Sequence, residues 1–537
     1  MNVGTYLDRR AQATPDAHGL GVEANGTIER WTWRELRDRA RRFARVLADS
    51  GVRRGDRVLV LAPPSRDWWC TIHALWFLGA APVLIDPGME RASFLAACKR
   101  IAPRVFVGSS KAQLARWLHR SSFASVELVF GIAAFAGRDI ARLAERAQPY
   151  EGQIEPREDE LAAVLFTSGA TGPAKGAEYT HANFAAQVDA LGELYSIRAG
   201  EVDLACFPLF ALFNAGFGLE SILPALDFTR PAECDPASIA AALEATRAAQ
   251  SFGSPAIWSR VVAWAEAHGK SFPHLARLMI AGAPVPPRLA LRAKALLPNG
   301  EVHTPYGATE ALPVANATAT DLERVRAKAE GGSGAFLGRL APGIELALIR
   351  IGDEPIATWS DALRMKPGEA GEICVRGAVA TRSYAFEPDA TARAKIADGA
   401  GFWHRMGDLG RLDESGELWL LGRKSHRVAT PKGLVFPVPI ESVFDLHEYV
   451  RQSALVGIGA PGAERPYLIV VPKKERFPRD RRLQQKLAMD ILRTGAWFPC
   501  CTVVEGVLFR DSLPVDPRHN AKIDRSALKR WAEDELA

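Results

Sequence analysis

Residues 164–176 read VLFTSGATGPAKG, an apolar run followed at once by hydroxyls, glycines and a single lysine. Hydroxyl groups and a lysine can donate hydrogen bonds to an anion, and glycines let backbone N–H groups approach it closely. The stretch differs from the Walker loop G-x-x-x-x-G-K-[ST], because no Ser or Thr follows Lys175. Gly, Ser, Thr and Pro are also common in turns, so the stretch alone leaves a polyphosphate site and a plain surface turn open.

The size and charge of the chain indicate an ordinary globular protein of several lobes. Its 537 residues are too many for a single core, so we expect at least two domains. An apolar content of 48% and a charged content of 24% are typical of such proteins. The net charge of +5 is too dilute over this length to indicate nucleic-acid binding.

The cysteines and the apolar segments favour a cytoplasmic location. Seven cysteines are scattered without a C-x-x-C pair, and the adjacent Cys500-Cys501 is no zinc spacing. A reducing compartment fits this pattern. The N-terminus has no apolar segment of the kind found in signal peptides. The apolar stretch at 71–85 is broken by Gly79 and Pro82, which predicts a helix and a strand, so we expect no transmembrane segment.

The hydrophobic pattern predicts an α/β fold with doubly wound, largely parallel sheets. Asn25-Gly26 lies between two apolar runs and indicates a hairpin, and the Thr32 to Glu35 spacing is that of a capping box. A strand at 56–61, a helix at 67–78 and a strand at 81–85 follow. After about residue 310 the pattern changes to short strands at 344–351 and 372–376 and a hairpin at 409–421. From about residue 424 a smaller α+β module is expected, with strands at 453–458 and 467–471.

Other patterns have ordinary structural explanations. Residues 457–462 match G-x-G-x-x-G, but a strand follows them where a dinucleotide site needs a helix, so we predict a hairpin loop. The basic run at 473–482 contains Glu475 and Asp480, which favours a solvated helix start over a phosphate or membrane site. His303 and His404 are expected to be packed or on the surface. The segment AKAEGGSG at 327–334 is predicted to be a flexible loop.

Several further motifs follow the first in a definite order: YGATE at 306–310, GEICVRG at 371–377, MGD at 406–408, GRK at 422–424 and KIDR at 522–525. In YGATE, an aromatic ring, a glycine turn, a hydroxyl and a carboxylate could stack a base and hold a phosphate-bound Mg²⁺. Each motif is weak alone.

Together with the first stretch, these motifs resemble the adenylate-forming superfamily, which includes acyl-CoA synthetases, luciferases and the adenylation domains of peptide synthetases. The family pattern is roughly T-S-G-[ST]-T-G-x-P-K-G, Y-G-x-T-E, G-E-[IL]-x-[IV]-x-G, T-G-D and G-R, then a lysine in K-[IV]-x-R. The resemblance implies a large adenylation domain at residues 1–422 that binds ATP and the acyl substrate and includes a β-rich lobe. It also implies a small mobile α+β domain at residues 423–537 that carries the catalytic lysine.

The resemblance further implies a role for each matching residue. The expected ATP-binding residues are Thr167, Ser168, Gly169, Thr171, Gly172 and Lys175 around the phosphates, Gly282, Ala283, Pro284 and Tyr306 beside the adenine, Gly307 in the same motif, and Asp408 and Arg423 on the ribose. The expected catalytic residues are Thr309 at the α-phosphate, Glu310 on Mg²⁺, and Lys522 between the carboxylate and the α-phosphate. Because two anions must meet in this reaction, a cation between them stabilises the transition state more than the ground state.

A narrower resemblance covers much of the chain. FPLFALFNAGFG (207–218), LDFTRPAECDP (226–236), FGSPAIWSRVV (252–262), TPYGATEALPVA (304–315), LGRKSHRV (421–428) and PVDPRHNAKI (514–523) are similar to β-lactone synthetases of long-chain olefin biosynthesis. That branch activates a 2-alkyl-3-hydroxy fatty acid as its acyl-adenylate, and the substrate's own hydroxyl then closes a lactone and expels AMP. The tethered hydroxyl is present at high effective concentration, so no external acceptor is needed.

Departures from the wider family fit this branch. Acyl-CoA synthetases usually carry a histidine after P-L-F, where this chain has Ala211. The segment after Arg423 reads KSHRVATPKG, with Ser425 near the hinge position and apparently one extra residue, and the usual E-I-E becomes P-I-E at 439–441. These changes put CoA binding in doubt and leave adenylation largely untouched. Met406 in place of the threonine of T-G-D, and P-A-K in place of x-P-K, are further departures.

Other functions stay open at this point. The first alternative is a long-chain fatty acyl-CoA synthetase or fatty acyl-AMP ligase. A nucleotide-binding regulatory protein and an oxidative enzyme of luciferase type are further alternatives. A serine hydrolase is disfavoured, because the chain has no G-x-S-x-G. The resemblance also implies partner enzymes, a reductase upstream and a β-lactone decarboxylase downstream, with which the protein could assemble.

Overall fold

The computed structural model describes residues 3–86, 88–134, 138–152, 155–167, 174–478, 480–514 and 523–537. The chain packs as two compact units, each with its own core. The first unit comprises Met1–Val314, Ala341–Ile344 and Arg376–Lys395, and the second comprises Ala315–Leu340, Glu345–Val375 and Ile396–Ala537.

The first unit begins as the sequence predicts. Helix α1 (Thr5–Ala13) is followed by the hairpin of β1 (His18–Ala24) and β2 (Thr27–Thr32) and by helix α2 (Trp33–Asp49). Asn25 and Gly26 both have positive φ, at 52° and 75°, as a two-residue hairpin turn requires. The backbone N–H of Thr32 donates to the Glu35 carboxylate at 2.7 Å, and the Thr32 hydroxyl accepts from the Glu35 N–H. The predicted hairpin and capping box are therefore confirmed.

One sheet of the first unit has the order β6-β5-β3-β4-β7-β8 and is parallel except for its last strand. Its strands are β3 (Arg57–Leu61), β4 (Ala81–Leu84), β5 (Val105–Gly108), β6 (Leu128–Gly131), β7 (Leu161–Thr167) and β8 (Lys175–Thr180). The helices that accompany it are α3 (Arg66–Phe77), α4 (Arg91–Ile101), α5 (Ser110–Leu118), α6 (Ile140–Ala144) and α7 (His181–Tyr195).

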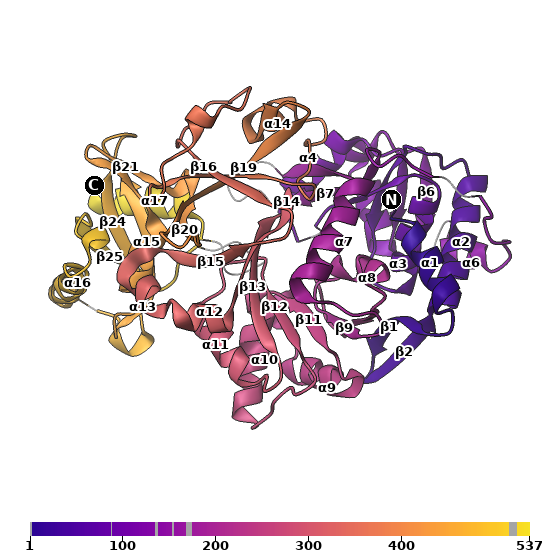
Figure 1. Ribbon diagram of the computed structural model, residues 1–537, viewed down its shortest axis with the longest axis horizontal. Coiled ribbons are helices and arrows are strands. Elements are labelled where there is room, and N and C mark those ends of the chain that lie inside the picture. Colours follow the sequence, from indigo (N-terminus) through magenta and orange to yellow (C-terminus); the bar gives the residue numbers. More distant parts are fainter. Residues whose placement is uncertain are drawn as a thin grey trace. The chain divides into compact units, whose positions relative to one another are not determined.

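The second sheet of this unit runs β13-β12-β11-β9-β10-β1-β2 and is parallel from β13 to β1. Its further strands are β9 (Val202–Ala205), β10 (Glu220–Leu223), β11 (Gln250–Gly253), β12 (Arg277–Ile280) and β13 (Glu301–Ala308). The helices between them are α8 (Asn214–Phe217), α9 (Pro236–Thr246), α10 (Pro255–Ala267) and α11 (Pro287–Ala295), and β14 (Ala311–Thr318) follows β13. Two mostly parallel sheets with helical crossovers confirm the predicted doubly wound α/β fold (Figure 1).

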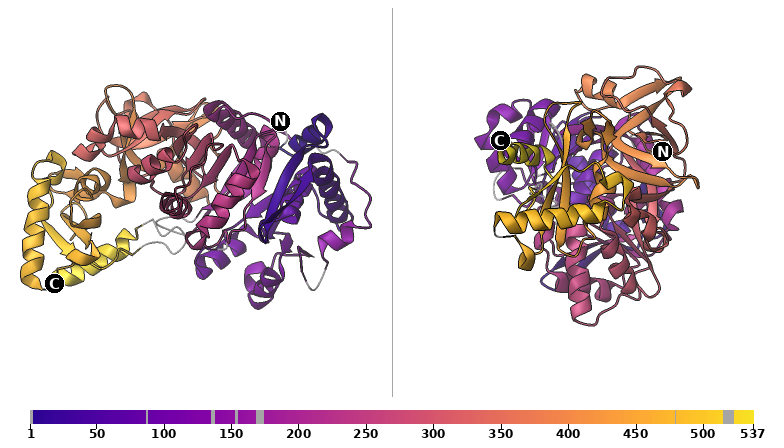
Figure 2. Two further views of the ribbon diagram at one scale, coloured as in Figure 1. Left: turned by 90° about the horizontal axis from the view of Figure 1, so that it is seen from below. Right: turned by 90° about the vertical axis from the view of Figure 1, so that its left-hand side faces the viewer.

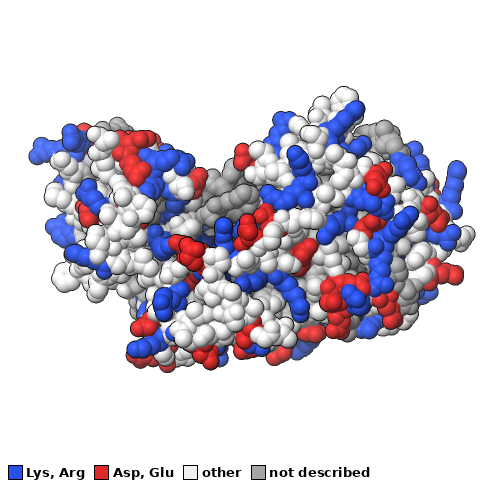
Figure 3. All heavy atoms as spheres, turned by 90° about the horizontal axis from the view of Figure 1, so that it is seen from above, with Lys and Arg blue, Asp and Glu red and all other residues white. Residues whose placement is uncertain are grey.

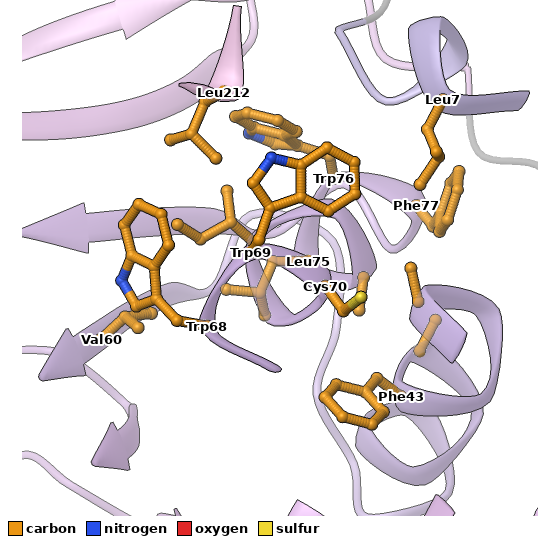
Figure 4. Packing of buried hydrophobic residues seen from close by; sticks show 14 of the residues in the cluster. Leu7, Phe43, Val60, Trp68, Trp69, Cys70, Leu75, Trp76, Phe77 and Leu212 are labelled. Carbon is orange, nitrogen blue, oxygen red and sulfur yellow. The ribbon is translucent and has the colours of Figure 1, made fainter. Parts of the chain in front are cut away.

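Helix α3 forms the centre of the core of this unit. It packs on β4 of one sheet and on β1 of the other, and every residue from Trp68 to Phe77 is buried. The indole N–H of Trp69 donates to the carbonyl of Ala211 at 3.3 Å, and that of Trp76 donates to the carbonyl of Ala162 at 2.8 Å. Figure 4 shows these two indoles among the aliphatic side chains that surround them. The apolar stretch at 71–85 is therefore a buried helix and strand, as predicted.

The second unit begins with a β-rich lobe. Its antiparallel strands run in the order β16-β17-β19-β20-β15. They are β15 (Ala335–Leu340), β16 (Glu345–Ile349), β17 (Gly371–Arg376), β19 (Gly401–Leu412) and β20 (Leu418–Arg423), with β18 (Lys395–Asp398) beside β19. The turn between β19 and β20 falls at residues 413–417, so the predicted strands and hairpin are confirmed.

A smaller α+β module with a three-stranded and a two-stranded sheet completes the second unit. It contains β21 (Val428–Thr430), β22 (Gly433–Val435), α15 (Pro437–Phe444), β23 (Val450–Ile458), β24 (Arg465–Pro472), α16 (Arg481–Gly495), β25 (Gly506–Phe509) and α17 (Arg525–Leu536). Helix α17 packs on β23 and α16 packs on β25, as the orange and yellow segments of Figure 2 show. The G-x-G-x-x-G match joins β23 to β24 and is a hairpin loop, as predicted, with positive φ at Gly459 and Gly462.

The prediction of a flexible loop at 327–334 is wrong, because most of this segment is helical. The structure has helix α13 (Arg326–Lys328) and then a wide helical turn at Ala329–Ser333 that packs against α15. A Cβ on Gly332 would lie 2.4 Å from Cys500 Sγ, and the residue has φ 83°. Gly332 therefore serves close packing in a positive-φ backbone, which composition alone does not distinguish from flexibility.

Four global expectations compare with the structure as follows. The predicted boundary between residues 422 and 423 falls within β20 of the second unit and stays a prediction. No helix among the described residues is long and apolar enough to cross a membrane. On the face drawn in Figure 3, basic and acidic side chains are interspersed, in keeping with the small net charge. All seven cysteines are free.

Candidate active site

The glycine-rich stretch connects the antiparallel strands β7 and β8. Thr167 at the end of β7 pairs with Lys175 at the start of β8. Since β7 is parallel to β4, the loop begins at the carboxyl edge of the sheet, where ligands bind in open α/β folds. Ser168, Gly169, Thr171 and Gly172, and the side chain of Thr167, lie outside the described residues.

Gly176 has a different purpose from the one expected for the loop glycines. A Cβ at this position would lie 2.8 Å from Val164 Cγ1 and 2.9 Å from the Phe166 ring. The carbonyl of Gly176 accepts a hydrogen bond from the Ala385 N–H at 2.8 Å. The glycine thus allows close packing within the hairpin and leaves its backbone engaged by residues 383–385.

Lys175 and Glu310 meet at a residue that sequence reasoning missed, Tyr384. The Lys175 ammonium lies over the Tyr384 ring, 5.2 Å from its centroid. The hydroxyl of the same tyrosine donates to Glu310 Oε1 at 2.7 Å. Tyr384 is only 7% exposed, so it is a fixed partner for both groups. The structure therefore brings the loop lysine and the carboxylate of the second motif to one place.

The backbone of Thr309 and Glu310 is held on both sides of the turn between β13 and β14. The Tyr179 hydroxyl donates to the Thr309 carbonyl, while the N–H and hydroxyl of Thr381 donate to the Glu310 carbonyl at 2.8 Å and 3.3 Å. Gly307 stands before this turn, and a Cβ there would lie 2.9 Å from the Ala311 carbonyl oxygen. The second motif is thus a rigid turn, which suits residues that must meet a ligand in one geometry.

Lys395 is a second residue that sequence reasoning missed. Its ammonium donates to the carbonyl of Thr381, the residue that holds Glu310. Burial lowers the pKa of Lys395 to about 7, although the nearby Glu310 carboxylate acts in the opposite direction. A buried lysine next to a motif carboxylate is a feature of functional sites. Its position, 85 residues along the chain from Glu310, left no signal in the motif pattern.

The predicted adenine-binding residues lie at one edge of the second sheet. Gly282, Ala283 and Pro284 follow β12, and Tyr306 lies near the end of β13. The two strands are parallel with Met279 opposite His303, so the chain continues from both toward the same edge of the sheet. Gly282 has φ 90°, which a side chain would strain. His303 packs edge-on against Tyr195, with 4.9 Å between ring centroids, as expected for a packed histidine.

The predicted ribose-binding residues pair with each other in the second unit. Asp408 on β19 lies opposite Arg423 on β20, and Arg423 Nε is 3.1 Å from Asp408 Oδ1. The Asp408 side chain is 8% exposed and that of Arg423 is 41% exposed, so the pair opens to solvent on the arginine side. Met406, which replaces the usual threonine, is buried, and its carbonyl accepts from Arg423 Nη1 at 3.4 Å. His404, two residues before it, is also buried.

The third and fifth motifs meet in a buried ion cluster. Arg405 Nη2 donates to Glu372 Oε2 at 2.6 Å, and Lys424 Nζ lies 3.0 Å from Glu372 Oε1. Arg405 also donates to the carbonyls of Gly352 and Glu354, at 2.5 Å and 2.7 Å. Glu372 is 1% exposed, so this carboxylate is neutralised within the protein.

Lys522 lies outside the described residues, but the residues next to it are anchored. Arg525 donates to both oxygens of Glu441, at 2.6 Å and 2.8 Å, and to the Leu455 carbonyl at 2.8 Å. The N–H of Asp524 donates to the Pro514 carbonyl at 2.8 Å, so the chain leaves and re-enters the described structure at one place. Glu441 is the last residue of the altered P-I-E, and its carboxylate anchors Arg525 of the KIDR motif.

His426 lies near both the KIDR motif and Arg423, which is predicted to bind the ribose. Its pKa is lowered by burial and then by the charges of Arg525 and Arg423. Both arginines therefore lie near this imidazole, one from the ribose pair and one from the KIDR motif. The motif residues of the second unit thus gather around the segment Lys424–His426.

Two of the departures from the wider family, at Ala211 and after Arg423, can be located in the structure. Ala211 is fully buried in a short turn under α3, with its carbonyl bonded to the Trp69 indole. The altered segment after Arg423 forms the hairpin of β21 and β22, in which Thr430 pairs with Gly433 around Pro431 and Lys432. This turn is exposed.

The comparisons with known proteins show the family of the chain. A model of AMP-binding enzymes matches residues 7–385, and the chain belongs to this family. It is an AMP-forming ligase of the adenylate-forming superfamily. The chain is 40% identical over 539 residues to an olefin β-lactone synthetase of Stenotrophomonas maltophilia (strain K279a), covering 98% of this chain and 96% of that protein.

Two further comparisons extend this result. An olefin β-lactone synthetase of Xanthomonas campestris pv. campestris is 37% identical, over 99% of this chain and 97% of its own length. Among solved structures, ATP-bound MatB from Rhodopseudomonas palustris superposes with a TM-score of 0.80 at 21% identity, covering 100% of this chain and 99% of that one. The predicted fold class and the predicted family are therefore confirmed.

Proposed function

We propose that the protein is a β-lactone synthetase that uses ATP to activate a long-chain 2-alkyl-3-hydroxy fatty acid. The observation that carries this proposal is the likeness, over nearly the whole chain, to two olefin β-lactone synthetases. The buried alanine at the family's histidine position and the altered hinge segment support it, since both depart from the pattern of CoA ligases.

The proposed reaction has two steps. An oxygen of the substrate carboxylate bonds to the α-phosphorus of ATP, and the bond to the bridging oxygen breaks, which releases pyrophosphate. The oxygen of the 3-hydroxyl then bonds to the acyl carbon, the bond to AMP breaks, and the hydroxyl proton passes to solvent. The products are a β-lactone, AMP and pyrophosphate. Because the nucleophile is tethered, the second step needs no acceptor molecule.

We assign the phosphates of ATP to the loop that ends at Lys175 and to Thr309. The adenine would lie between Gly282-Ala283-Pro284 and Tyr306, and the ribose would contact Asp408 and Arg423. Two observations support this assignment. Lys175 and Glu310 share Tyr384, and Gly282 follows β12, which is parallel to β13, the strand that carries Tyr306. Lys522 would bridge the two anions of the first step.

Glu310 suits a magnesium ion. Tyr384 occupies one of its oxygens, and no hydrogen bond among the described residues occupies the other. No group of three or more metal-ligating side chains occurs among the described residues, so the ion would rely on this carboxylate and on the phosphates of ATP. Mg²⁺ is commonly bound in this way, and it would neutralise charge on the phosphates. The task of Tyr384 and Thr381 is to orient the carboxylate.

The decisive experiment mixes the enzyme with ATP, Mg²⁺ and a 2-alkyl-3-hydroxy fatty acid in the absence of CoA. We expect equal amounts of lactone, AMP and pyrophosphate over many turnovers. A matched acid without the 3-hydroxyl should give only a single-turnover burst of pyrophosphate, because its adenylate cannot cyclise. A strict requirement for CoA would overturn the proposal, and thioester formation from unsubstituted fatty acids would identify an acyl-CoA ligase instead.

The same experiment decides the remaining alternatives. Binding of ATP without release of pyrophosphate would indicate a regulatory protein. Turnover that stops without oxygen would indicate oxidative chemistry of the luciferase type. We further propose that the protein works in the cytoplasm beside a reductase that supplies the 3-hydroxyl and a decarboxylase that consumes the lactone. Co-sedimentation of the three purified proteins would test their assembly.

A further inference from the structure

Helix α5 (Ser110–Leu118) turns its apolar side outward. None of its residues is buried, and Leu114, Trp117 and Leu118 are 57%, 56% and 60% exposed. Their spacing of three and four residues places them on one face of the helix. Three large apolar side chains together in water are unfavourable, and such patches mark surfaces that contact something else.

The inward side of the same helix is polar. Gln113 Nε2 donates to the Phe130 carbonyl at 2.7 Å. The guanidinium of Arg116 lies 5.8 Å from the centre of the Phe106 ring. Only Ala112 adds an apolar contact to the core cluster beneath. An amphipathic helix normally packs the other way round, so the outward apolar face is not explained by the stability of this unit.

Basic side chains surround this apolar face. Lys111 and Arg120 are exposed, and the Arg120 guanidinium lies 5.4 Å from the centre of the Trp117 ring. Arg91 reaches the neighbouring His119 at 2.7 Å. Glu90 and Asp227 are exposed acidic groups of the same region. Hydrogen bonds from Thr229 are the main cause of the lowered pKa of Asp227, and Lys111 is a lesser one.

The sheet topology relates this helix to the glycine-rich stretch that follows β7. Strand β5, which precedes α5, is parallel to β3, β3 is parallel to β4, and β4 is parallel to β7. The helix and the loop that follows β7 therefore begin at the same carboxyl edge of one sheet. A surface that docks through α5 would bring this edge close to it.

We propose that the outward face of α5 docks on the surface of an anionic lipid bilayer. Leu114, Trp117 and Leu118 enter the boundary between headgroups and acyl chains, where leucine and tryptophan are favoured. Lys111, Arg120 and Arg91 meet the lipid phosphates, which gives the surface its charge complementarity. This inference goes beyond the proposed reaction, although a fatty acid with two long chains would itself reside in a bilayer.

The test is flotation of the full-length protein with phosphatidylcholine vesicles that contain phosphatidylglycerol, in the absence of ATP and fatty acid. We expect binding that weakens with added salt and is much lower on pure phosphatidylcholine. Trp117→Ser and Leu118→Ser should each weaken binding by about tenfold, since burial of one such side chain contributes at least this factor. Lys111→Glu with Arg120→Glu should reduce binding to anionic vesicles.

The matched control is Trp497→Ser, because Trp497 is 84% exposed and belongs to the other unit. It should leave vesicle binding unchanged. Each α5 variant should keep the wild-type rate of adenylation with a short, water-soluble 3-hydroxy acid. Absence of flotation, equal loss in the Trp497 variant, or light scattering that shows the face buried between two copies would overturn the proposal. The assay needs no turnover, so it stands even if no lactone forms.

Discussion

Two motif glutamates, Glu310 and Glu372, have opposite surroundings. Glu310 is half-buried, and a neutral phenol holds one of its oxygens at 2.7 Å. Glu372 is 1% exposed and lies between Arg405 and Lys424, at 2.6 Å and 3.0 Å. Two directly bound cations compensate the charge of Glu372, whereas Glu310 has no salt bridge among the described residues, although the buried Lys395 lies near it. Both residues are glutamates of a family motif. Their partners decide which of them can bind a ligand and which of them stabilises the fold.

The largest effect should come from Lys522, the lysine that we propose to bridge the two anions of the first step. We expect Lys522→Ala to slow adenylation by about 10³-fold, because a fixed charge aimed at the transition state contributes this much, and to leave ATP affinity nearly unchanged. Pyrophosphate release in single turnover and calorimetric ATP binding measure the two quantities. Lys424→Ala is the matched control, and it should lower thermal stability instead. Near-normal pyrophosphate release in the Lys522 variant would show that its assignment is wrong.

The second effect tests Glu310 itself. Glu310→Gln keeps the shape and the hydrogen bond to Tyr384 but removes the charge, so adenylation should fall by about 10²- to 10³-fold. The melting temperature should stay close to that of the wild type, since no ion pair among the described residues is lost. Pyrophosphate release as a function of Mg²⁺ concentration measures the first effect. A variant with an unchanged rate and an unchanged Mg²⁺ requirement would remove Glu310 from the reaction.

Glu372→Gln should give the converse result. Removing this charge leaves Arg405 and Lys424 as uncompensated cations in a buried site, which costs about 3 kcal/mol of unfolding free energy. Urea denaturation at constant slope measures the loss. Below its melting range the variant should adenylate within a few-fold of the wild-type rate. If the glutamine variant is as stable as the wild type but inactive, the contrast between the two glutamates disappears.

The smallest effect concerns a buried titratable group without a hydrogen-bond partner among the described residues. His73 lies between Trp69 and Trp76 in α3, and neither ring nitrogen has a hydrogen bond among the described residues. Burial lowers the pKa of His73 to about 3. Because the unfolded chain binds this proton near pH 6.5, stability from this group is complete above pH 6.5 and is lost as the pH falls toward 3. His73→Leu should therefore stabilise more at pH 5 than at pH 8, by about 2 kcal/mol.

The measurement for His73 is the urea midpoint at both pH values. At pH 8 a smaller gain is expected as well, because leucine removes an unsatisfied buried polar group. If the stability of the variant depends on pH as that of the wild type does, the pKa of His73 is not lowered in solution. Its ring would then form hydrogen bonds that the structure does not show. His268→Leu, at an exposed site, is the control and should change neither value.

Much of the fold could be predicted from the sequence because its signals are local. The hairpin at Asn25-Gly26, the capping box at Thr32 and the crossover pattern up to β4 depend on residues only a few positions apart. The segment at 327–334 shows the limit of such signals. Its glycines read as flexibility, yet in the structure Gly332 gives room to Cys500, which lies 168 residues further along the chain.

The site divides in the same way. The motifs pointed to Lys175, Glu310, Asp408 and Arg423, whose residue types and order carry the family pattern. Tyr384, Lys395 and Tyr179 were not foreseen, although they hold the second motif in place. Tyr384 contacts Glu310 across 74 residues of sequence, and a hydrogen bond over that distance leaves no periodic or local trace.

By itself the sequence determined the class of fold and the membership of the adenylate-forming superfamily, and it predicts which residues contact a nucleotide. These follow from hydrophobic periods, turn chemistry and the order of short motifs, all of which are written within a few residues. Only the tertiary structure decided that Glu310 accepts a hydrogen bond from a neutral phenol, that Glu372 is paired with two cations, and that α5 turns its apolar face outward. The reason is that the solvation and the partners of a side chain depend on which distant segments fold against it.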